Sequence, residues 1–391
     1  MDGHPLALYI HIPYCVHKCS YCDFHSRVEA TIPQQRYIDA LLLEAHFWRQ
    51  QLTADPRPIH TLFLGGGTPS LFDPQQIARL LTGLKQLWSF APGCEITLEA
   101  NPESLTPERL AGYGEAGINR VSMGVQGLTN DRLTLLERPH DGAGAHQALR
   151  WLAEAGFTSW SADLIYATPG HTPAIWQREL EAVLDYDPPH LSCYALTLEP
   201  GTPMHADAEQ GHLTLPGEEM QLELFNLTHQ RLTDAGRPAY EVSNFAKPGH
   251  CCRHNLNYWR FGDYLGLGAA AHGKLTEPMS QGPKIRRTAN RADAALYMEQ
   301  LEESGTPPLN RDALLSPVTA ANECLMMGLR TLEGVSLAHY AELRGAELAQ
   351  QMASPLRWLQ KEGLVIMDKT DLRLTAEGLR LGDGVMSQLL E

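Results

Sequence analysis

Three cysteines lie close together in HIPYCVHKCSYCDFH, residues 11–25. Cys15, Cys19 and Cys22 fall within eight positions, just after the apolar, β-rich run LALYIHI at 6–12. A structural zinc ion usually takes four protein ligands, and a disulfide joins two cysteines. Three thiols at this spacing therefore point to a metal centre that needs one further ligand.

Two metal centres fit these residues. The first is a zinc ion, with His17 or His25 as the fourth ligand beside the three thiolates. The second is a 4Fe-4S cluster, in which three cysteine ligands would leave one iron free to bind a substrate or cofactor. Three unrelated thiols are a poor explanation for such tight spacing.

The composition is that of a globular chain with an acidic balance. The 391 residues are 43% hydrophobic and 20% charged, and the formal net charge is −15. This provides ample material for a core. The negative charge argues against a nucleic-acid partner, because a protein that binds nucleic acid needs a basic surface to meet phosphates.

The N-terminus, MDGHPLALYIHIPYC, lacks the basic start and long apolar segment of a secretory signal. No stretch is apolar for long enough to span a bilayer. We therefore expect a cytoplasmic protein whose eight cysteines are free thiols or metal ligands. Cys94, Cys193 and Cys324 lie in apolar runs and are expected to be inert buried thiols.

From residue 6 to about 200, short β-rich runs alternate with helical periods. Strands are expected at 6–12, 60–64, 95–100, 119–125, 159–166 and 190–198, and helices at 33–52, 74–88 and 106–117 among others. Such repeats imply parallel strands with right-handed crossovers. The pattern predicts an α/β fold that closes fully or partly into a (β/α)6 barrel, or stays open.

Polar residues and glycines gather where such a sheet binds ligands, at the C-terminal ends of its strands. These residues are Cys15, Cys19 and Cys22, then GGGTP at 65–69, then Glu99, Asn101 and Gln126, with Asp163 inside the fifth strand. The agreement predicts a catalytic or cofactor site in the first half of the chain.

The second half is organised differently. After a helix near 217–235, the segment 239–274 is rich in aromatic residues and histidine, and helices are expected at 319–332, 336–345 and 348–363, with short strands at 364–367 and 372–375. We expect a core domain over 1–240, a connecting region over 241–310, and a mostly helical, winged-helix-like domain over 311–391. The acidic balance suggests that this last domain docks or caps rather than binds DNA.

The motif CxxxCxxC after a first strand, with the aromatic Tyr21 before the last cysteine, resembles the signature of the radical S-adenosylmethionine (SAM) enzymes. GGGTP resembles the glycine-rich loop of that family, where the backbone approaches the methionine end of SAM. The resemblance implies a partial (β/α)6 barrel and a 4Fe-4S cluster on Cys15, Cys19 and Cys22. It also implies SAM on the open iron, cleaved by one electron to methionine and a 5′-deoxyadenosyl radical.

Further segments indicate one group within this family. They are LYIHIPYCVHKCSYCDF, FLGGGTPSLF, LEANPESL, RVSMGVQGL, ADLIYATPGHT and YEVSNFAKPGHCCRHNLNYW. Together these segments are similar to the coproporphyrinogen III dehydrogenase group, and within it to the HemW-type heme chaperones. The family resemblance implies that SAM is surrounded by Tyr9, Tyr21, Gly66, Gly67, Thr68, Glu99, Gln126, Arg138 and Asp163. In these roles Glu99 and Asp163 would accept hydrogen bonds from an amine or ribose, and Arg138 would pair with the SAM carboxylate.

Two departures separate the chain from the decarboxylase of this group. The enzyme motif continues as CxxxCxxCxC, whereas Phe24 stands at the last position here, and only 14 residues precede Cys15. The resemblance therefore implies a heme chaperone that delivers heme to apo-hemoproteins such as respiratory enzymes. The enzyme alternative is oxygen-independent oxidation of coproporphyrinogen III to protoporphyrinogen IX. A nucleic-acid modifier is a third class, against which the net charge argues.

A second group of residues lies in CCRHNLNYW, 251–259, whose HNxxYW core is His254, Asn255, Tyr258 and Trp259. Histidine is a common axial ligand of heme iron, tyrosine is a rarer one, and aromatic rings can line a porphyrin face. A hydrogen-bonded core histidine and a zinc site with Cys251 and Cys252 are the alternatives. The resemblance implies a heme motif, and His272 in AAAHGK is a second candidate ligand.

The resemblance also implies partners. They are heme itself, the recipient apo-hemoproteins and an electron donor such as flavodoxin or ferredoxin. Peripheral contact with a membrane would come through the recipient.

Overall fold

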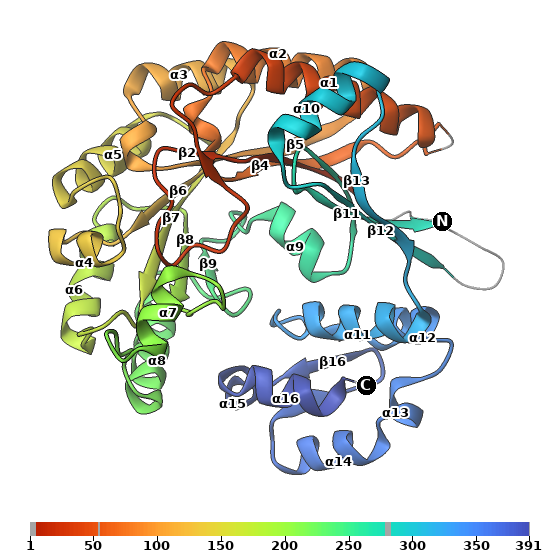
Figure 1. The fold of residues 1–391 in the computed structure, drawn as a ribbon. Helices are drawn as coiled ribbons and strands as arrows, with labels where there is room; N and C mark the ends of the chain where they lie inside the picture. The colour runs from red at the N-terminus through yellow and green to blue at the C-terminus, as the bar shows by residue number, and fades with distance from the viewer. Residues whose placement is uncertain (1–4, 54, 278–282, 391) are drawn as a thin grey trace.

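A computed structural model describes residues 5–53, 55–277 and 283–390, and one large curved sheet dominates it (Figure 1). In the described residues this sheet has 11 strands in the order β13-β12-β11-β10-β1-β4-β5-β6-β7-β8-β9. Seven neighbouring strands, from β10 through β1 to β8, run parallel. Helices α1 to α6 cover the outer, convex side (Figure 1).

The six predicted strand–helix repeats are present. The strands are β1 (Leu6–Ile12), β4 (Ile59–Gly66), β5 (Phe90–Ala100), β6 (Arg120–Gln126), β7 (Ser159–Tyr166) and β8 (His190–Ala195). The helices between them are α1 (Gln34–Gln51), α2 (Pro74–Leu87), α3 (Pro107–Ala116), α4 (Asn130–Leu135), α5 (Gly142–Glu154) and α6 (Pro173–Leu184). The prediction of a partial (β/α)6 barrel is confirmed.

The local sequence explains these elements. β1 is buried on both faces, as expected for a central parallel strand between helices and barrel interior. In α2, Pro74 occupies the first turn after Asp73, where a missing N–H costs nothing. Its buried residues Ile77, Leu80, Leu81 and Leu84 recur at helical spacing and face the sheet.

Residues 241–314 add strands to both edges of the sheet, which the sequence pattern did not predict. β9 (Asn244–Ala246) pairs antiparallel with β8, and β10 (Asp263–Leu267) pairs parallel with β1. β11 (His272–Glu277), β12 (Lys284–Asn290) and β13 (Leu309–Leu314) continue the sheet as antiparallel strands. The helices α9 (Arg253–Trp259) and α10 (Ala294–Ser304) belong to the same segment, and α7 (Pro203–Glu209) and α8 (Glu218–Asp234) precede it, after β8.

The C-terminal residues form a mostly helical unit whose hydrophobic core is separate from that of the barrel and also includes Phe261 and Ile285. Its helices are α11 (Pro317–Gly328), α12 (Leu337–Arg344), α13 (Leu348–Gln351), α14 (Ala353–Lys361), α15 (Ala376–Arg380) and α16 (Gly382–Leu389). A three-stranded sheet, β14 (Val335–Ser336), β16 (Asp371–Leu374) and β15 (Val365–Met367), resembles the wing of a winged helix. The single helix expected over 348–363 is two helices, α13 and α14, that meet at Met352. The three-part division at residues 240 and 310 stays a prediction.

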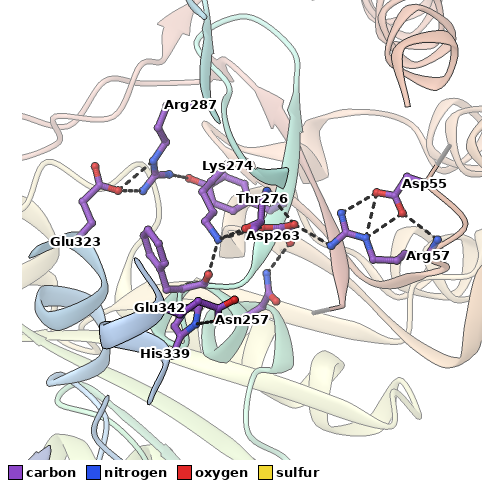
Figure 2. Close-up of polar contacts among 12 residues, drawn as sticks. Asp55, Arg57, Asn257, Asp263, Lys274, Thr276, Arg287, Glu323, His339 and Glu342 are labelled. Carbon is purple, nitrogen blue, oxygen red and sulfur yellow. Dashed lines mark hydrogen bonds and ion pairs between the residues drawn. The ribbon is translucent and has the colours of Figure 1, made fainter. Parts of the chain in front are cut away.

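A polar cluster joins the sheet to this C-terminal unit (Figure 2). Arg287 of β12 pairs with Glu323 of α11. Beside it, the buried Lys274 ammonium lies 3.0 Å from Asp263 Oδ1, and Arg57 Nη1 lies 2.8 Å from Asp263 Oδ2. Because a buried charge is costly unless it is paired, these contacts fix the register of β10 and β11.

None of the described helices combines the length and apolar character that a membrane span requires.

Candidate cluster and cofactor site

A cavity of about 380 Å³ opens at the C-terminal ends of the parallel strands. All six predicted strands or the loops after them contribute to its wall, and β7 does so through Asp163 and Ile165 within the strand. The predicted cluster and SAM residues that line it are Cys15, Cys19, Cys22, Tyr21, Gly66, Gly67, Thr68, Glu99, Gln126, Arg138 and Asp163. Of the predicted set, Tyr9 does not line this cavity. The fold therefore brings together residues that lie up to 148 positions apart in the sequence, from Cys15 to Asp163.

The cysteine loop presents three free thiols to one cavity. Cys15 ends the short strand β2 (Tyr14–Cys15), which pairs with β3 (Arg27–Val28), and the Cys22 N–H donates to the Cys19 carbonyl at 3.1 Å. Cys19 is buried, and the other two thiols are half-buried. Within the described ranges, no three His, Cys, Asp or Glu side chains converge closely enough to hold a single metal ion.

A chain of hydrogen bonds connects Cys15 with Cys19 across the cavity wall. Thr68 Oγ1 donates to Cys15 Sγ at 3.6 Å, and Asn101 Nδ2 donates to Thr68 Oγ1 at 2.9 Å. Arg138 Nη2 donates to Asn101 Oδ1 at 2.7 Å, while its Nη1 donates to Cys19 Sγ at 3.6 Å. Burial raises the pKa of the Cys19 thiol, and the Arg138 charge acts against that shift. Donors aimed at both sulfurs suit thiolate ligands, which carry the negative charge.

The glycine-rich loop requires its glycines. Gly66 has a φ of +110°, and a Cβ there would lie 2.4 Å from the His11 ring. A Cβ on Gly67 would lie 2.6 Å from the Tyr14 carbonyl oxygen. Any larger residue would therefore strain the backbone or push the neighbouring strand away. The bare backbone leaves the cavity floor open to a ligand.

Two carboxylates face the cavity in different environments. Burial raises the pKa of Glu99 to about 7, and the Gly66 N–H donates to its Oε2 at 3.0 Å. Asp163 accepts hydrogen bonds from Ser122 Oγ at 2.9 Å and from Ser161 Oγ at 2.7 Å. Oxygen atoms on both side chains can accept hydrogen bonds from a ligand amine or hydroxyl.

The backbone is in a left-handed conformation at Gln126 and at the residue before Arg138. Gln126 has a φ of 65°, and Glu137, just before Arg138, has a φ of 49°. Left-handed conformations of this kind cost energy in residues other than glycine and gather at functional sites. The Arg138 guanidinium also donates to the Gly124 carbonyl at 3.2 Å and to the Tyr21 hydroxyl at 3.4 Å. In this arrangement Arg138 holds the cavity wall together.

Some lining residues carry no predicted role. Asn101 stands at a predicted strand end and has no predicted role in the SAM site, yet its side chain bridges Thr68 and Arg138. Tyr194 and Thr197 also line the cavity, from the end of β8. Both residues lie near the end of the predicted strand HLSCYALTL, so the rule that ligands bind at strand ends also predicts them as lining residues.

Tyr9 lies in a second cavity, of about 360 Å³, beside the first. Its hydroxyl is 3.0 Å from His11 Nδ1. Gly66 and Glu99 line both cavities and form a wall between them. Tyr258, Tyr264 and His272 also line the second cavity.

The four residues of the HNxxYW core do not converge on one cavity. His254 is fully buried, with Nδ1 2.8 Å from Thr61 Oγ1 and Nε2 2.8 Å from the Tyr258 hydroxyl. Burial lowers its pKa to about 3, so the imidazole is neutral. Tyr258 lines the second cavity, whereas Asn255 and Trp259 line neither of the two. Both ring nitrogens of His254 are thus occupied by protein groups.

Residues 9–183 match the family model of the radical SAM superfamily, and residues 315–381 match the model of the HemN C-terminal domain. The solved structure of coproporphyrinogen III oxidase (HemN) from Escherichia coli, a radical SAM enzyme, is similar with a TM-score of 0.80. It is 26% identical, and the similarity covers 100% of this chain and 91% of that chain. The fold and the three-cysteine cavity thus define a radical SAM protein.

Two relatives identify the family within this superfamily to which the chain is similar. Heme chaperone HemW from Haemophilus influenzae is 40% identical over 344 residues, which are 87% of this chain and 86% of that protein. Radical S-adenosyl methionine domain-containing protein 1, mitochondrial, from Bos taurus is 34% identical over 98% of this chain and 87% of its own length. The chain belongs to the HemW family. Membership of the radical SAM superfamily implies a 4Fe-4S cluster and SAM.

Proposed function

We propose that this protein is a heme chaperone that binds heme and delivers it to apo-hemoproteins such as respiratory enzymes. The observation that carries the proposal is the cavity that gathers three free thiols, the glycine-rich loop and the strand-end polar residues in a chain 40% identical to a heme chaperone. We place its work in the cytoplasm. A flavodoxin or ferredoxin would supply the electron that the cluster needs.

Cys15, Cys19 and Cys22 are the proposed ligands of the 4Fe-4S cluster, which would supply an open iron and one electron when bound. Thr68 and Arg138 donate hydrogen bonds toward the sulfurs of Cys15 and Cys19, which suits sulfur atoms that would carry negative charge as iron ligands. The residue types fit, because thiolates are the usual ligands of such clusters.

The remaining cavity residues are proposed to hold SAM. Gly66 and Gly67 let the methionine end approach the backbone, while Glu99 and Asp163 accept hydrogen bonds from the amine or ribose hydroxyls. Tyr21, Thr68, Gln126 and Arg138 complete the pocket, and Tyr9 supports the Gly66–Glu99 wall from the other side. A Cβ at Gly66 or Gly67 would collide with the His11 ring or the Tyr14 backbone and so displace the loop that lines this pocket.

Heme binding is proposed to involve the HNxxYW core of α9, with the heme treated as cargo. Tyr258 reaches the second cavity, and His254 orients it through the 2.8 Å hydrogen bond. Asn255 and Trp259 belong to the same helix, and Arg330 lies over the Trp259 ring at 6.0 Å. The C-terminal domain, residues 311–391, is proposed to dock or cap.

The test is anaerobic reconstitution with iron and sulfide, followed by heme titration and absorption spectroscopy. A broad cluster band should appear first, and a separate heme band should grow on titration. Transfer is then checked by adding an apo-hemoprotein and measuring loss of heme from this protein. A cluster that forms without any heme binding would rule out the chaperone function.

The second candidate is an oxygen-independent coproporphyrinogen III oxidase, because the HemN structure is similar over the whole chain. Its reaction would begin with hydrogen abstraction from a propionate side chain by the deoxyadenosyl radical. Phe24, which is 60% exposed, stands where that enzyme's motif has a fourth cysteine. Anaerobic formation of protoporphyrinogen IX would establish the oxidase, whereas heme binding without turnover supports the chaperone.

A further inference from the structure

The second cavity is built like a ligand pocket rather than a packing defect. Its volume of about 360 Å³ lies within the range of organic-ligand sites, roughly 300–1,000 Å³. It shares Gly66, Glu99, Asp23 and Phe24 with the cluster and SAM cavity. A molecule bound there would lie next to whatever occupies the first cavity.

Aromatic rings form much of its wall. Tyr258 and Tyr264 pack edge to face with ring centroids 4.6 Å apart, and Tyr9 on the neighbouring strand β1 also lines the cavity. The exposed Phe24 ring lies at the boundary of the two cavities. Aromatic rings at a cavity wall can pack by face or edge against a planar conjugated ligand.

Three imidazoles also face this cavity, and they are not equivalent. His11 is buried and fixed, with Nδ1 3.0 Å from the Tyr9 hydroxyl and Nε2 2.8 Å from the His25 carbonyl oxygen. His25 and His272 are exposed, and neither ring makes a hydrogen bond within the described part of the chain. An imidazole at a cavity wall with free nitrogen atoms is a ready metal ligand.

The turn just before His272 is fixed by hydrogen bonds to buried side chains. It comprises Gly268–Ala271, and Ala270 within it has a φ of 63°. The Tyr37 hydroxyl accepts a hydrogen bond from the Ala269 N–H at 3.0 Å, and Glu44 Oε2 accepts one from the Gly268 N–H at 2.8 Å. A strained residue persists only where its surroundings fix it.

Glu44 is the centre of that support. Its carboxylate is fully buried and also accepts hydrogen bonds from Asn290 Nδ2 at 2.7 Å, from the Tyr297 hydroxyl and from Trp48 Nε1. Burying a carboxylate is costly unless donors surround it, and the cluster and SAM site makes no use of this group. Its role in the fold is to fix the turn before His272.

We propose that this second cavity is the heme site and that His272 is the axial ligand of the heme iron. The inference rests on the proposed heme-chaperone function and assigns the position of the cargo. Heme placed there would lie against Tyr258 and Tyr264, across the Gly66–Glu99 wall from SAM. His254 would act as a positioning residue, because both of its nitrogens already bond to Thr61 and Tyr258.

The Asp23 and Glu99 carboxylates also line the cavity, so the cations beside His272 are the groups that would attract the heme propionates. Burial and the positive charges of Arg287 and Arg311 lower the pKa of His272. The neutral imidazole, which is the form that binds iron, therefore prevails near neutral pH. Arg311 is exposed on β13 and offers a cation for a heme propionate.

The experiment is a hemin titration of the full chain with its reconstituted cluster, in the wild type, His272→Ala and His46→Ala. His46 is an exposed histidine on α1 whose ring bonds to Gln50, so it is a matched control. We expect His272→Ala to bind heme roughly tenfold more weakly or worse, with a shifted heme band. Added imidazole should restore the band, and His46→Ala should match the wild type. Metal-free protoporphyrin should bind the wild type and His272→Ala equally.

Each other outcome has a distinct meaning. Equal heme binding by the wild type and His272→Ala would overturn the assignment while leaving the chaperone function intact. A wild type that binds no heme would instead remove the chaperone function itself. If His272→Ala loses heme, is not restored by imidazole and melts at lower temperature than His46→Ala, the residue is structural and the assignment fails.

Discussion

The Arg138 guanidinium lies 3.6 Å from the Cys19 sulfur, and the same side chain is joined through Asn101 and Thr68 to the sulfur of Cys15. A cationic side chain therefore supports two of the three thiols from one side of the cavity. This arrangement gives the half-buried Arg138 side chain a role at the cavity wall. It also places Arg138 between the proposed SAM pocket and the cysteine loop.

Replacing Arg138 with alanine should weaken the cofactor site without removing the cluster ligands. Hydrogen bonds to charged groups contribute about 1.5–3 kcal/mol each, so we expect SAM affinity to fall roughly tenfold or more. Iron content after reconstitution should decline less than SAM binding. Arg150→Ala, on the exposed face of α5, is the control. Unchanged SAM affinity in Arg138→Ala would contradict the proposed role.

Each of the substitutions Cys15→Ser, Cys19→Ser and Cys22→Ser should abolish the stable cluster. A serine hydroxyl is a poor ligand for iron of this kind, and the proposed site has no fourth protein ligand in reserve. Iron and sulfide analysis after anaerobic reconstitution measures the effect. Cys94→Ala, at a buried thiol of β5 away from the cavity, should retain the cluster. Full iron loading in any of the three serine variants would exclude that cysteine as a ligand.

SAM binding should depend on pH through Glu99, whose pKa burial raises to about 7. The carboxylate becomes charged as the pH rises through that value, and only the charged form accepts hydrogen bonds through both oxygens. We therefore expect SAM affinity to increase between about pH 6 and pH 8. Equilibrium dialysis at several pH values measures the change, and Glu99→Gln should give a weaker and flatter profile. A wild-type profile as flat as that of the variant would refute the role of Glu99.

Gly66→Ala should destabilise the fold more than Gly93→Ala. Both glycines have positive φ, 110° and 66°, so both substitutions carry a backbone penalty of about 1–2 kcal/mol. A Cβ at Gly93 meets nothing within 4 Å, whereas one at Gly66 lies 2.4 Å from the His11 ring. Moving that ring costs a further 1–3 kcal/mol or so. Thermal unfolding of the two variants separates the contributions, and equal melting temperatures would show that the loop can absorb the contact.

The six parallel strands and the edge at which ligands meet could be predicted because they depend on local sequence. The β-rich runs are short and clearly bounded, and the strand-end rule then places Cys15, Gly66 and Glu99 at one edge. β10 could not be predicted in the same way. Its residues DYLGL pair with β1, so that Leu6 lies opposite Asp263, and no local pattern records a partner so far away.

The parts of the site that could not be predicted depend on similar distant contacts. Tyr9 and His11 lie two residues apart in β1 and so point to the same face, toward the second cavity rather than the first. The burial of His254 depends on Thr61, which is 193 positions earlier in the chain. A sequence motif names residue types, but it does not show which hydrogen bonds those residues have already made.

His254→Gln should change stability and its dependence on pH. The imidazole pKa is about 3 in the folded protein and near 6.5 when unfolded, so the folded state binds fewer protons between these values. Stability from His254 is therefore fully present above about pH 6.5 and is lost as the pH falls toward 3.

At neutral pH the substitution should cost about 1–3 kcal/mol, because the Thr61 or Tyr258 hydroxyl loses its partner. Thermal unfolding at pH 7.5 and pH 5 measures both effects. The variant should melt lower than the wild type at the higher pH, and the difference should shrink at the lower pH. A difference that grows on acidification would mean that His254 is charged in the folded protein, which its burial between Phe63 and Tyr258 argues against.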